Sequence, residues 1–213
     1  MRIHFDEQLD RLNEEIINMG TLIQQAIGMA VEALIRRDVE KAKQTMDFDA
    51  EIDHQEKIIE NLCLKLLLQQ QPVAKDLRVI SAALKMITDM ERIGDHASDI
   101  SELAIQLADL PRIEQLPDIE AMAKETMVML IQGLEAYVER NYEKAEKVIA
   151  HDDVIDDLFS RVKQELIDII QKDSDYAGQA ADLLMVAKYF ERIGDHATNI
   201  AEWVIFSITG KHE

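Results

Sequence analysis

The heptapeptide Glu-Arg-Ile-Gly-Asp-His-Ala occurs twice in the chain, at residues 91–97 and again at residues 191–197. The three residues that follow are related as well, Ser98-Asp99-Ile100 in the first copy and Thr198-Asn199-Ile200 in the second. An identical string one hundred positions apart indicates an internal duplication. The string is also chemically unusual, because it places Glu and Asp four residues apart, on one face of an otherwise apolar helical pattern.

Apolar residues on both sides of the repeated string recur at alternating steps of three and four, the spacing of one helix face. Cap and break signals divide this pattern into six segments: residues 4–36, a second beginning at the cap Asp38, a third from after Gln71-Pro72 to about 108, a fourth over 118–140, a fifth after the cap Asn141, and a sixth after a break at 173–178. Short connections make neighbouring helices antiparallel. The sequence therefore predicts an all-α protein of two tandem antiparallel three-helix bundles, residues 1–110 and 117–213, with a linker between Pro111 and Pro117.

The chain is strongly acidic, with 42 Asp and Glu against 23 Lys and Arg and a net charge of −19. A surface of this charge repels nucleic acid and anionic lipid head groups, so we expect no nucleic-acid binding, and basic protein surfaces or cations are the natural partners. The single cysteine, Cys63, permits no internal disulfide. No signal peptide or membrane-spanning run is evident, which predicts a cytoplasmic protein without direct membrane insertion.

Carboxylates interrupt the apolar helix faces at matching places in the two repeats. Positions four apart share a helix face, so the acids of each repeat form ladders on two neighbouring helices. In the first repeat these acids are Asp49 and Asp53 on the second helix, and Glu91, Asp95 and Asp99 on the third. In the second repeat they are Asp152 and Asp156 on the fifth helix, and Glu191 and Asp195 on the sixth.

Acids on a core face need their charge balanced, because desolvating an unpaired carboxylate is costly. Raised pKa values, pairing with Arg92 and Arg192, or bound cations would each balance it. One arginine per repeat leaves most of the charge uncovered. Oxygen-only clusters suit hard or borderline cations such as Mg, Ca, Mn and Fe, with His96 or His196 as a nitrogen ligand for Fe or Zn. The nine ladder acids are therefore candidate metal ligands for Fe, Zn, Mn or Mg.

Two three-helix units, each with paired Glu/Asp-x-x-x-Asp patterns and the string Glu-Arg-Ile-Gly-Asp-His, resemble the PhoU family over essentially the whole chain. The resemblance implies a non-enzymatic cytoplasmic regulator of phosphate uptake that binds metal clusters on these motifs. It also implies an adaptor that contacts the ATPase subunit of the phosphate ABC transporter and a phosphate-sensing histidine kinase. We expect a homo-oligomer, with a homodimer as the simplest form. Such a regulator represses the phosphate-starvation response when phosphate is plentiful, and acts at the inner membrane only through its partners.

The second repeat departs from the first at Asn199, which stands where the first repeat has Asp99. We therefore expect the second metal site to bind more weakly. A di-iron redox or metal-storage protein is the alternative function, although Glu51-x-x-His54 has no counterpart at Val154 and Asp157. A helical adaptor whose acids are merely solvated or paired is a third interpretation.

Overall fold

The computed structural model describes residues 2–69, 73–110, 113 and 117–211; the breaks predicted at Gln71-Pro72 and Pro111 lie outside these ranges. The described chain is helical throughout, without strands. Its long helices are α1 (Arg2–Arg36), α2 (Val39–Gln69), α3 (Ala74–Leu107), α4 (Pro117–Glu139), α5 (Tyr142–Lys172) and α6 (Ala177–Thr209), with a short 3-10 helix, η1 (Ser174–Tyr176), before α6. The predicted all-α fold of two three-helix units is confirmed. Within the described ranges, none of the helices is both long and apolar enough to cross a membrane.

The turn between α1 and α2 has the same conformation as the turn between α4 and α5. The predicted caps are confirmed, since Asp38 accepts a hydrogen bond from a backbone N–H of the first turn of α2, and Asn141 does the same for α5. The preceding residues, Arg37 and Arg140, both have positive φ, 56° and 54°. In each turn the capping residue also donates its own N–H to the carbonyl five residues earlier, a common way to end a helix. The duplication therefore extends to an unusual backbone conformation.

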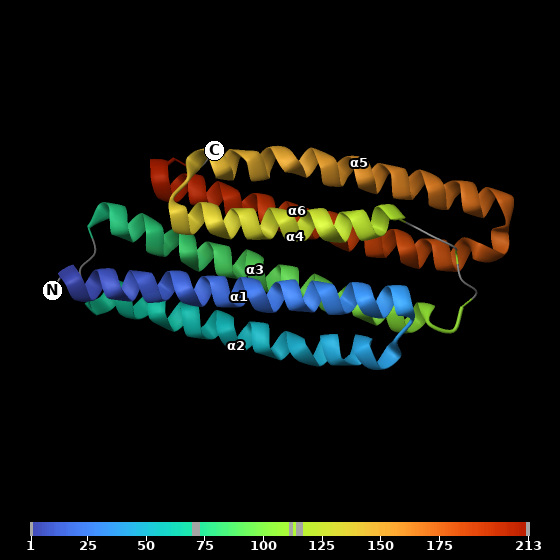
Figure 1. Cartoon of the computed structure of the whole chain (residues 1–213), viewed down its shortest axis with the longest axis horizontal. Helices are drawn as coiled ribbons and strands as arrows, with labels where there is room; N and C mark the ends of the chain where they lie inside the picture. Colours follow the sequence, from blue (N-terminus) through green and yellow to red (C-terminus); the bar gives the residue numbers. More distant parts are fainter. Residues whose placement is uncertain (1, 70–72, 111–112, 114–116, 212–213) are drawn as a thin grey trace.

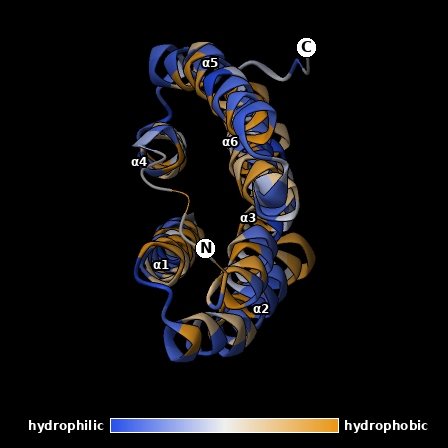
Figure 2. Ribbon diagram, turned by 90° about the vertical axis from the view of Figure 1, so that its right-hand side faces the viewer, coloured by the Kyte–Doolittle hydropathy of each residue, from blue (hydrophilic) through white to orange (hydrophobic). Residues whose placement is uncertain are grey.

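The helices form two curved layers. Seen end-on, α2, α3, α6 and α5 follow one another in an outer layer, and α1 and α4 lie against its inner side (Figure 2). Along their length the helices run roughly parallel or antiparallel to one another (Figure 1). Because α3 packs on α6 and α1 on α4, each helix at the middle of the molecule touches its counterpart from the other repeat.

One hydrophobic core runs through both repeats. Its fully buried members come from all six helices, among them Ile23 of α1, Ile93 of α3 and Ile193 of α6. These side chains are mostly Leu, Ile, Ala and Met, which are strong helix formers or pack well between helices. The predicted boundary between residues 110 and 117 falls between α3 and α4 along the chain, and the core is continuous across it.

Candidate metal centres

A glycine in each repeated string lets two helices approach closely beside a carboxylate. A Cβ added at Gly94 would lie 2.9 Å from Ile52 Cδ1 and 3.4 Å from Asp49 Oδ1. A Cβ at Gly194 would lie 3.2 Å from Asp152 Oδ1. The missing side chains therefore make room for the two aspartates against the backbones of α3 and α6.

The first carboxylate cluster consists of Asp49, Asp53, Glu91, Asp95 and Asp99, which the structure brings together between α2 and α3. Burial raises the pKa of Asp49 to about 6, and repulsion from Asp95, Asp53 and Asp99 adds to that shift. The Oδ1 atom of Asp49 is buried and makes no hydrogen bond. A buried carboxylate oxygen without a partner is costly, so this atom marks a place where positive charge would stabilise the fold.

One cation faces the first cluster directly. Arg92 Nε lies 3.4 Å from Glu91 Oε2, and Arg92 Nη1 donates to Asp95 Oδ2 at 2.8 Å. Burial still raises the pKa of Glu91, and the charge of Asp95 raises it further, against the opposing effect of Arg92. The Arg92 side chain is 56% exposed, so water screens much of its charge. The cluster thus keeps a large excess of negative charge.

The second carboxylate cluster consists of Asp152, Asp156, Glu191 and Asp195, between α5 and α6. Burial raises the pKa of Asp152 to about 6, with further contributions from Asp195, Asp156 and Glu191. Burial and the charge of Glu191 likewise raise the pKa of Asp195. Lys188, one turn before Glu191 on α6, forms an ion pair with it. The two clusters thus share a half-buried aspartate, Asp49 or Asp152, but differ in their cations.

One position that distinguishes the two clusters was not predicted as part of either site: it holds Glu56 in the first repeat and Phe159 in the second. Glu56 lies next to the first cluster, where burial and the charge of Asp53 raise its pKa. The matching position in the second repeat is Phe159, and Lys188 Nζ lies 5.5 Å from the centroid of its ring. Glu56 follows Asp49 by seven residues, two turns along the same face, so the helical period was the available signal. The first cluster is therefore the more negative of the two.

The two repeated strings meet where α3 packs on α6. The imidazole rings of His96 and His196 have centroids 5.6 Å apart. Each ring is held by a carboxylate, with His96 Nδ1 3.3 Å from Asp99 Oδ2 and His196 Nδ1 2.8 Å from Asp89 Oδ1. Asn199 donates to the same Asp89 oxygen at 3.0 Å. Asp99, a member of the first cluster, thus also contacts His96. Its counterpart Asn199 instead donates to Asp89, a residue that the sequence did not single out.

The donor sets fit hard or borderline cations, because both clusters consist of carboxylate oxygens. In the part of the chain that the structure describes, no three His, Cys, Asp or Glu side chains converge closely enough to hold an ion as they stand. Glu51 and His54, the pair that suggested a di-iron site, are both exposed on α2. An ion at either cluster would therefore have to draw the carboxylates toward it.

Comparisons with known proteins point to one family. The model of the PhoU domain matches the chain twice, over residues 16–104 and 119–204. A protein of Clostridium acetobutylicum named as a phosphate-specific transport system accessory protein PhoU homolog is 39% identical, over 97% of this chain and 95% of its own. A Synechocystis protein of the same name is 35% identical, over 100% of this chain and 94% of its own.

Solved structures agree in fold. The crystal structure of PhoU from Pseudomonas aeruginosa superposes with a TM-score of 0.90 at 30% sequence identity, covering 97% of this chain and 100% of that one. The phosphate transport system regulatory protein PhoU from Streptococcus pneumoniae superposes with a TM-score of 0.88 at 27% identity, covering 98% and 99%. With the duplicated family domain and full-length relatives, this chain belongs to the PhoU family.

Proposed function

We propose that this protein is a non-enzymatic cytoplasmic regulator of phosphate transport, an adaptor between the ATPase subunit of the phosphate ABC transporter and a phosphate-sensing histidine kinase. It acts as a negative regulator when phosphate is plentiful. Support comes from the relatives, which are named as phosphate-specific transport accessory proteins and align over nearly the whole chain. The net charge of −19 favours basic surfaces on such partners.

The two carboxylate clusters hold metal ions in this proposal. The observation that carries it is the buried, unpartnered Oδ1 of Asp49 within a group of five carboxylates. Asp49, Asp53, Glu91, Asp95 and Asp99 would hold one set of ions. A bound cation supplies the positive charge that Arg92 alone does not, and it ties α2 to α3. Asp152, Asp156, Glu191 and Asp195 would do the same between α5 and α6, with Fe, Zn, Mn or Mg as the ions.

Elemental analysis tests the metal sites. The protein is purified without chelators or a metal-affinity tag, beside the double variant Asp49→Asn/Asp152→Asn. Stoichiometric metal that disappears from the double variant is the expected result. Asp47→Asn is the matched control, because Asp47 is exposed on the same helix and its loss should leave the metal content unchanged. Equal metal in all three proteins would contradict the assignment.

The first site binds metal more tightly than the second, since Asp99 and Glu56 are replaced by Asn199 and Phe159, and Lys188 already compensates the second cluster. Metal titrations of Asp95→Ala, which retains the second cluster, and of Asp195→Ala, which retains the first, measure the difference. The variant Asp195→Ala should keep the higher affinity. A tighter site in Asp95→Ala would reverse the ranking.

Partner binding is tested with the purified ATPase subunit and the cytoplasmic part of the kinase, each immobilised separately. Binding of the metal-loaded protein to both, and a homodimer in light scattering, are the expected results. Binding that persists unchanged in Asp49→Asn/Asp152→Asn would show that the adaptor role does not need the ions. Binding to neither partner would overturn the adaptor role itself.

A further inference from the structure

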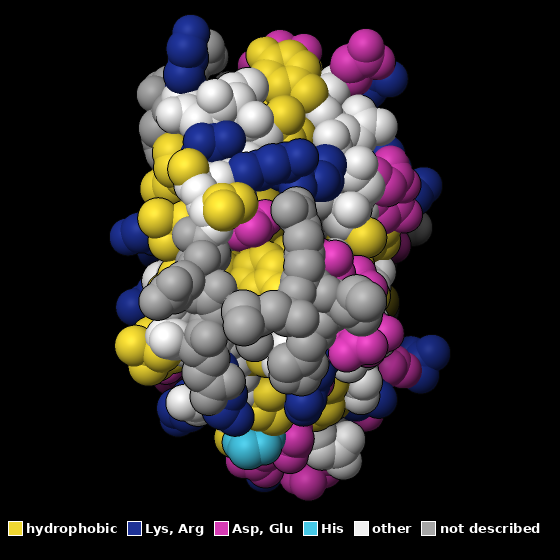
Figure 3. Space-filling model, turned by 90° about the vertical axis from the view of Figure 1, so that its left-hand side faces the viewer, with side chains coloured by type: hydrophobic (Ala, Val, Ile, Leu, Met, Phe, Trp, Pro, Cys, Tyr) yellow, Lys and Arg dark blue, Asp and Glu magenta, His cyan; other side chains and the backbone are white. Residues whose placement is uncertain are grey.

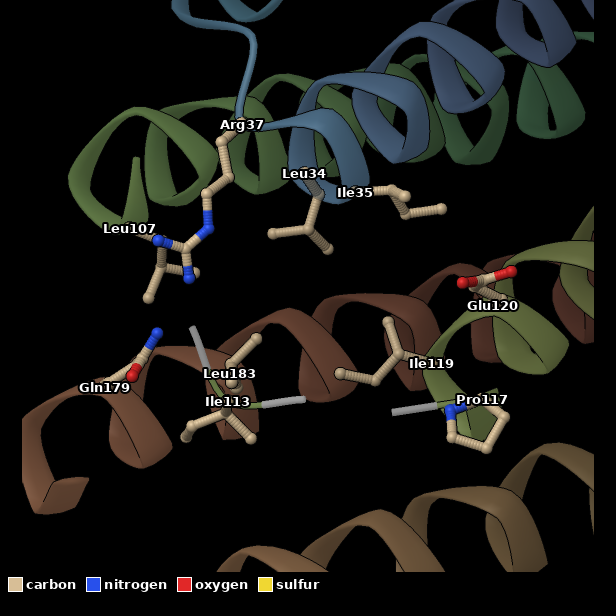
Figure 4. Close-up of a pocket in the computed structure, with 10 residues that line it drawn as sticks. All are labelled: Leu34, Ile35, Arg37, Leu107, Ile113, Pro117, Ile119, Glu120, Gln179 and Leu183. Atoms are coloured by element: carbon tan, nitrogen blue, oxygen red, sulfur yellow. The ribbon is translucent and has the colours of Figure 1, made fainter. Parts of the chain in front are cut away.

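A pocket of about 280 Å³ lies between the two repeats, at the end of the molecule where α1 and α3 end and α4 begins. Its walls come from the end of α1, the end of α3, the first turn of α4 and the start of α6 (Figure 4). Most of the lining is aliphatic, with Leu34, Leu107, Ile119 and Leu183 among the side chains that face it. Concave, mainly apolar pockets where two structural units meet are the usual form of small-molecule sites.

One buried polar group in this pocket lacks a partner. Gln179, on α6, is only 6% exposed, and its Oε1 atom makes no hydrogen bond within the protein. Figure 4 shows Gln179 at one end of the pocket, with its amide nitrogen toward Arg37 and Leu107 and its oxygen closer to the α6 backbone. A buried acceptor without a donor is rare in folded proteins, and one that lines a cavity is well placed to receive a donor from a ligand.

The charges around Gln179 restrict what that ligand can be. The Arg37 guanidinium donates to the carbonyl oxygens of Ala108 and Leu110, just past the end of α3. A cationic ligand would meet this guanidinium, and an anionic one would meet the negative end of the α3 dipole and the carboxylate of Glu120 at the rim. We propose that the pocket binds a small uncharged molecule with an apolar body and one N–H or O–H group, which donates to Gln179 Oε1.

The duplication supplies a comparison. A second pocket, of about 290 Å³, lies at the other end of the molecule and is lined by the counterpart arginine, Arg140. There the buried hydroxyls are satisfied, since Tyr137 donates to the carbonyl of Val79 at 3.4 Å and Ser207 to that of Val204 at 2.7 Å.

Figure 3 shows the end of the molecule that holds the second pocket, where charged side chains gather around apolar ones. Leu34 is the counterpart of Tyr137, 103 residues earlier, as Arg37 is of Arg140. The first pocket therefore combines an apolar wall with an unmatched acceptor, a combination that its pseudo-symmetric partner lacks.

Indole and indene test the proposal on the unaltered protein, because they have similar apolar bodies and indene lacks the N–H. Titrations followed by the methyl resonance of Ile119 should show saturable binding of both, with indole about tenfold tighter, the effect of one net hydrogen bond. Indene binding as tightly as indole, or no saturable binding of indole below its solubility limit, would overturn the proposal.

Three variants locate the binding. Gln179→Leu should weaken indole about tenfold, to the level of indene, and leave indene unchanged. Leu34→Tyr, which places a larger side chain on the apolar wall, should reduce the cavity volume and weaken binding of both. Ser207→Ala, in the second pocket, is the control and should bind both as the unaltered protein does. Thermal unfolding followed by circular dichroism checks that each variant is folded, and indole binding unaffected by Gln179→Leu would contradict the assigned acceptor.

Discussion

Asp49 and Asp152 occupy equivalent positions in the two repeats. Each lies against the glycine of a repeated string, and burial followed by neighbouring acids raises the pKa of each to about 6. The helix faces predicted their position, because their spacing continues an apolar stripe. The depth of burial depends on how closely α2 approaches α3 at Gly94, which is a tertiary property that the sequence does not state.

Removing the charge of Asp152 should separate its structural cost from its role with metal. At pH 8 in excess chelator, Asp152→Asn should raise the free energy of unfolding by about 1 kcal/mol, since it relieves burial and repulsion in a partly solvated group. With saturating metal the same variant should be the less stable protein, because it loses a ligand. Urea unfolding in both buffers measures the change of sign, and an identical effect in the two buffers would speak against a metal site.

The Asp118–Arg161 pair gives a pH-dependent prediction. Arg161 donates from Nε and Nη2 to the two oxygens of Asp118, at 2.8 and 3.1 Å, and these bonds lower the pKa of the carboxyl below 3.8. A lowered folded-state pKa contributes stability above the unfolded pKa of about 3.8, and that stability is lost as the pH falls through the folded value.

Arg161→Gln should therefore lower the melting midpoint by roughly one or two degrees at pH 7, and by less as the pH falls below 3.8. Calorimetry over this range tests it. A deficit that stayed constant down to pH 2 would assign the effect to packing instead.

Two glycines of α1 differ in their surroundings, so their alanine variants should affect the stability of the protein differently. A Cβ at Gly20 would overlap Leu134 Cδ1 of α4, whereas a Cβ at Gly28 would meet nothing within 4 Å. Gly28→Ala should stabilise the protein by about 0.5–1 kcal/mol through helix propensity alone. Gly20→Ala should lose that gain or become destabilising, because α1 and α4 must separate or Leu134 must change rotamer. Chemical denaturation of the two variants compares them, and equal gains would mean that α1 and α4 pack less closely than the structure shows.

The helices themselves could be predicted from the sequence, since their ends carry local signals. Asp38 and Asn141 cap as expected, and Pro117 begins α4. The contacts between repeats could not be predicted, because periodicity identifies an apolar face without naming the face that covers it. The pairing of His196 with Asp89, 107 residues away in sequence, is such a contact. The unpaired Oε1 atom of Gln179 could not be predicted either, because its surroundings depend on where α3 ends beside α6.

Because the two repeats share one hydrophobic core, we predict that neither folds stably without the other. Residues 1–110 or 117–213 expressed alone would expose the helix faces along which α3 packs on α6 and α1 packs on α4. Each half should therefore aggregate or lack fixed tertiary structure, and the two should recover a cooperative unfolding transition when refolded together. Near-ultraviolet circular dichroism of the halves, alone and mixed, measures this. A half that unfolds cooperatively by itself would show that the repeat is an autonomous domain.

Because α2 is long, a small rotation at the first cluster would produce a much larger displacement at the end of the helix. Asp53 lies well inside α2, and the stretch from it to Gln69 is roughly 24 Å long at 1.5 Å per residue. A pivot of about 5° where α2 meets α3 would carry that far end through roughly 2 Å, a displacement set by helix geometry alone. Leu68, 83% exposed near that end, would travel with it. If an ion drew the carboxylates together and rotated α2 by this angle, the end of α2 near Leu68 would move, at a distance where the ion's own charge is screened by salt.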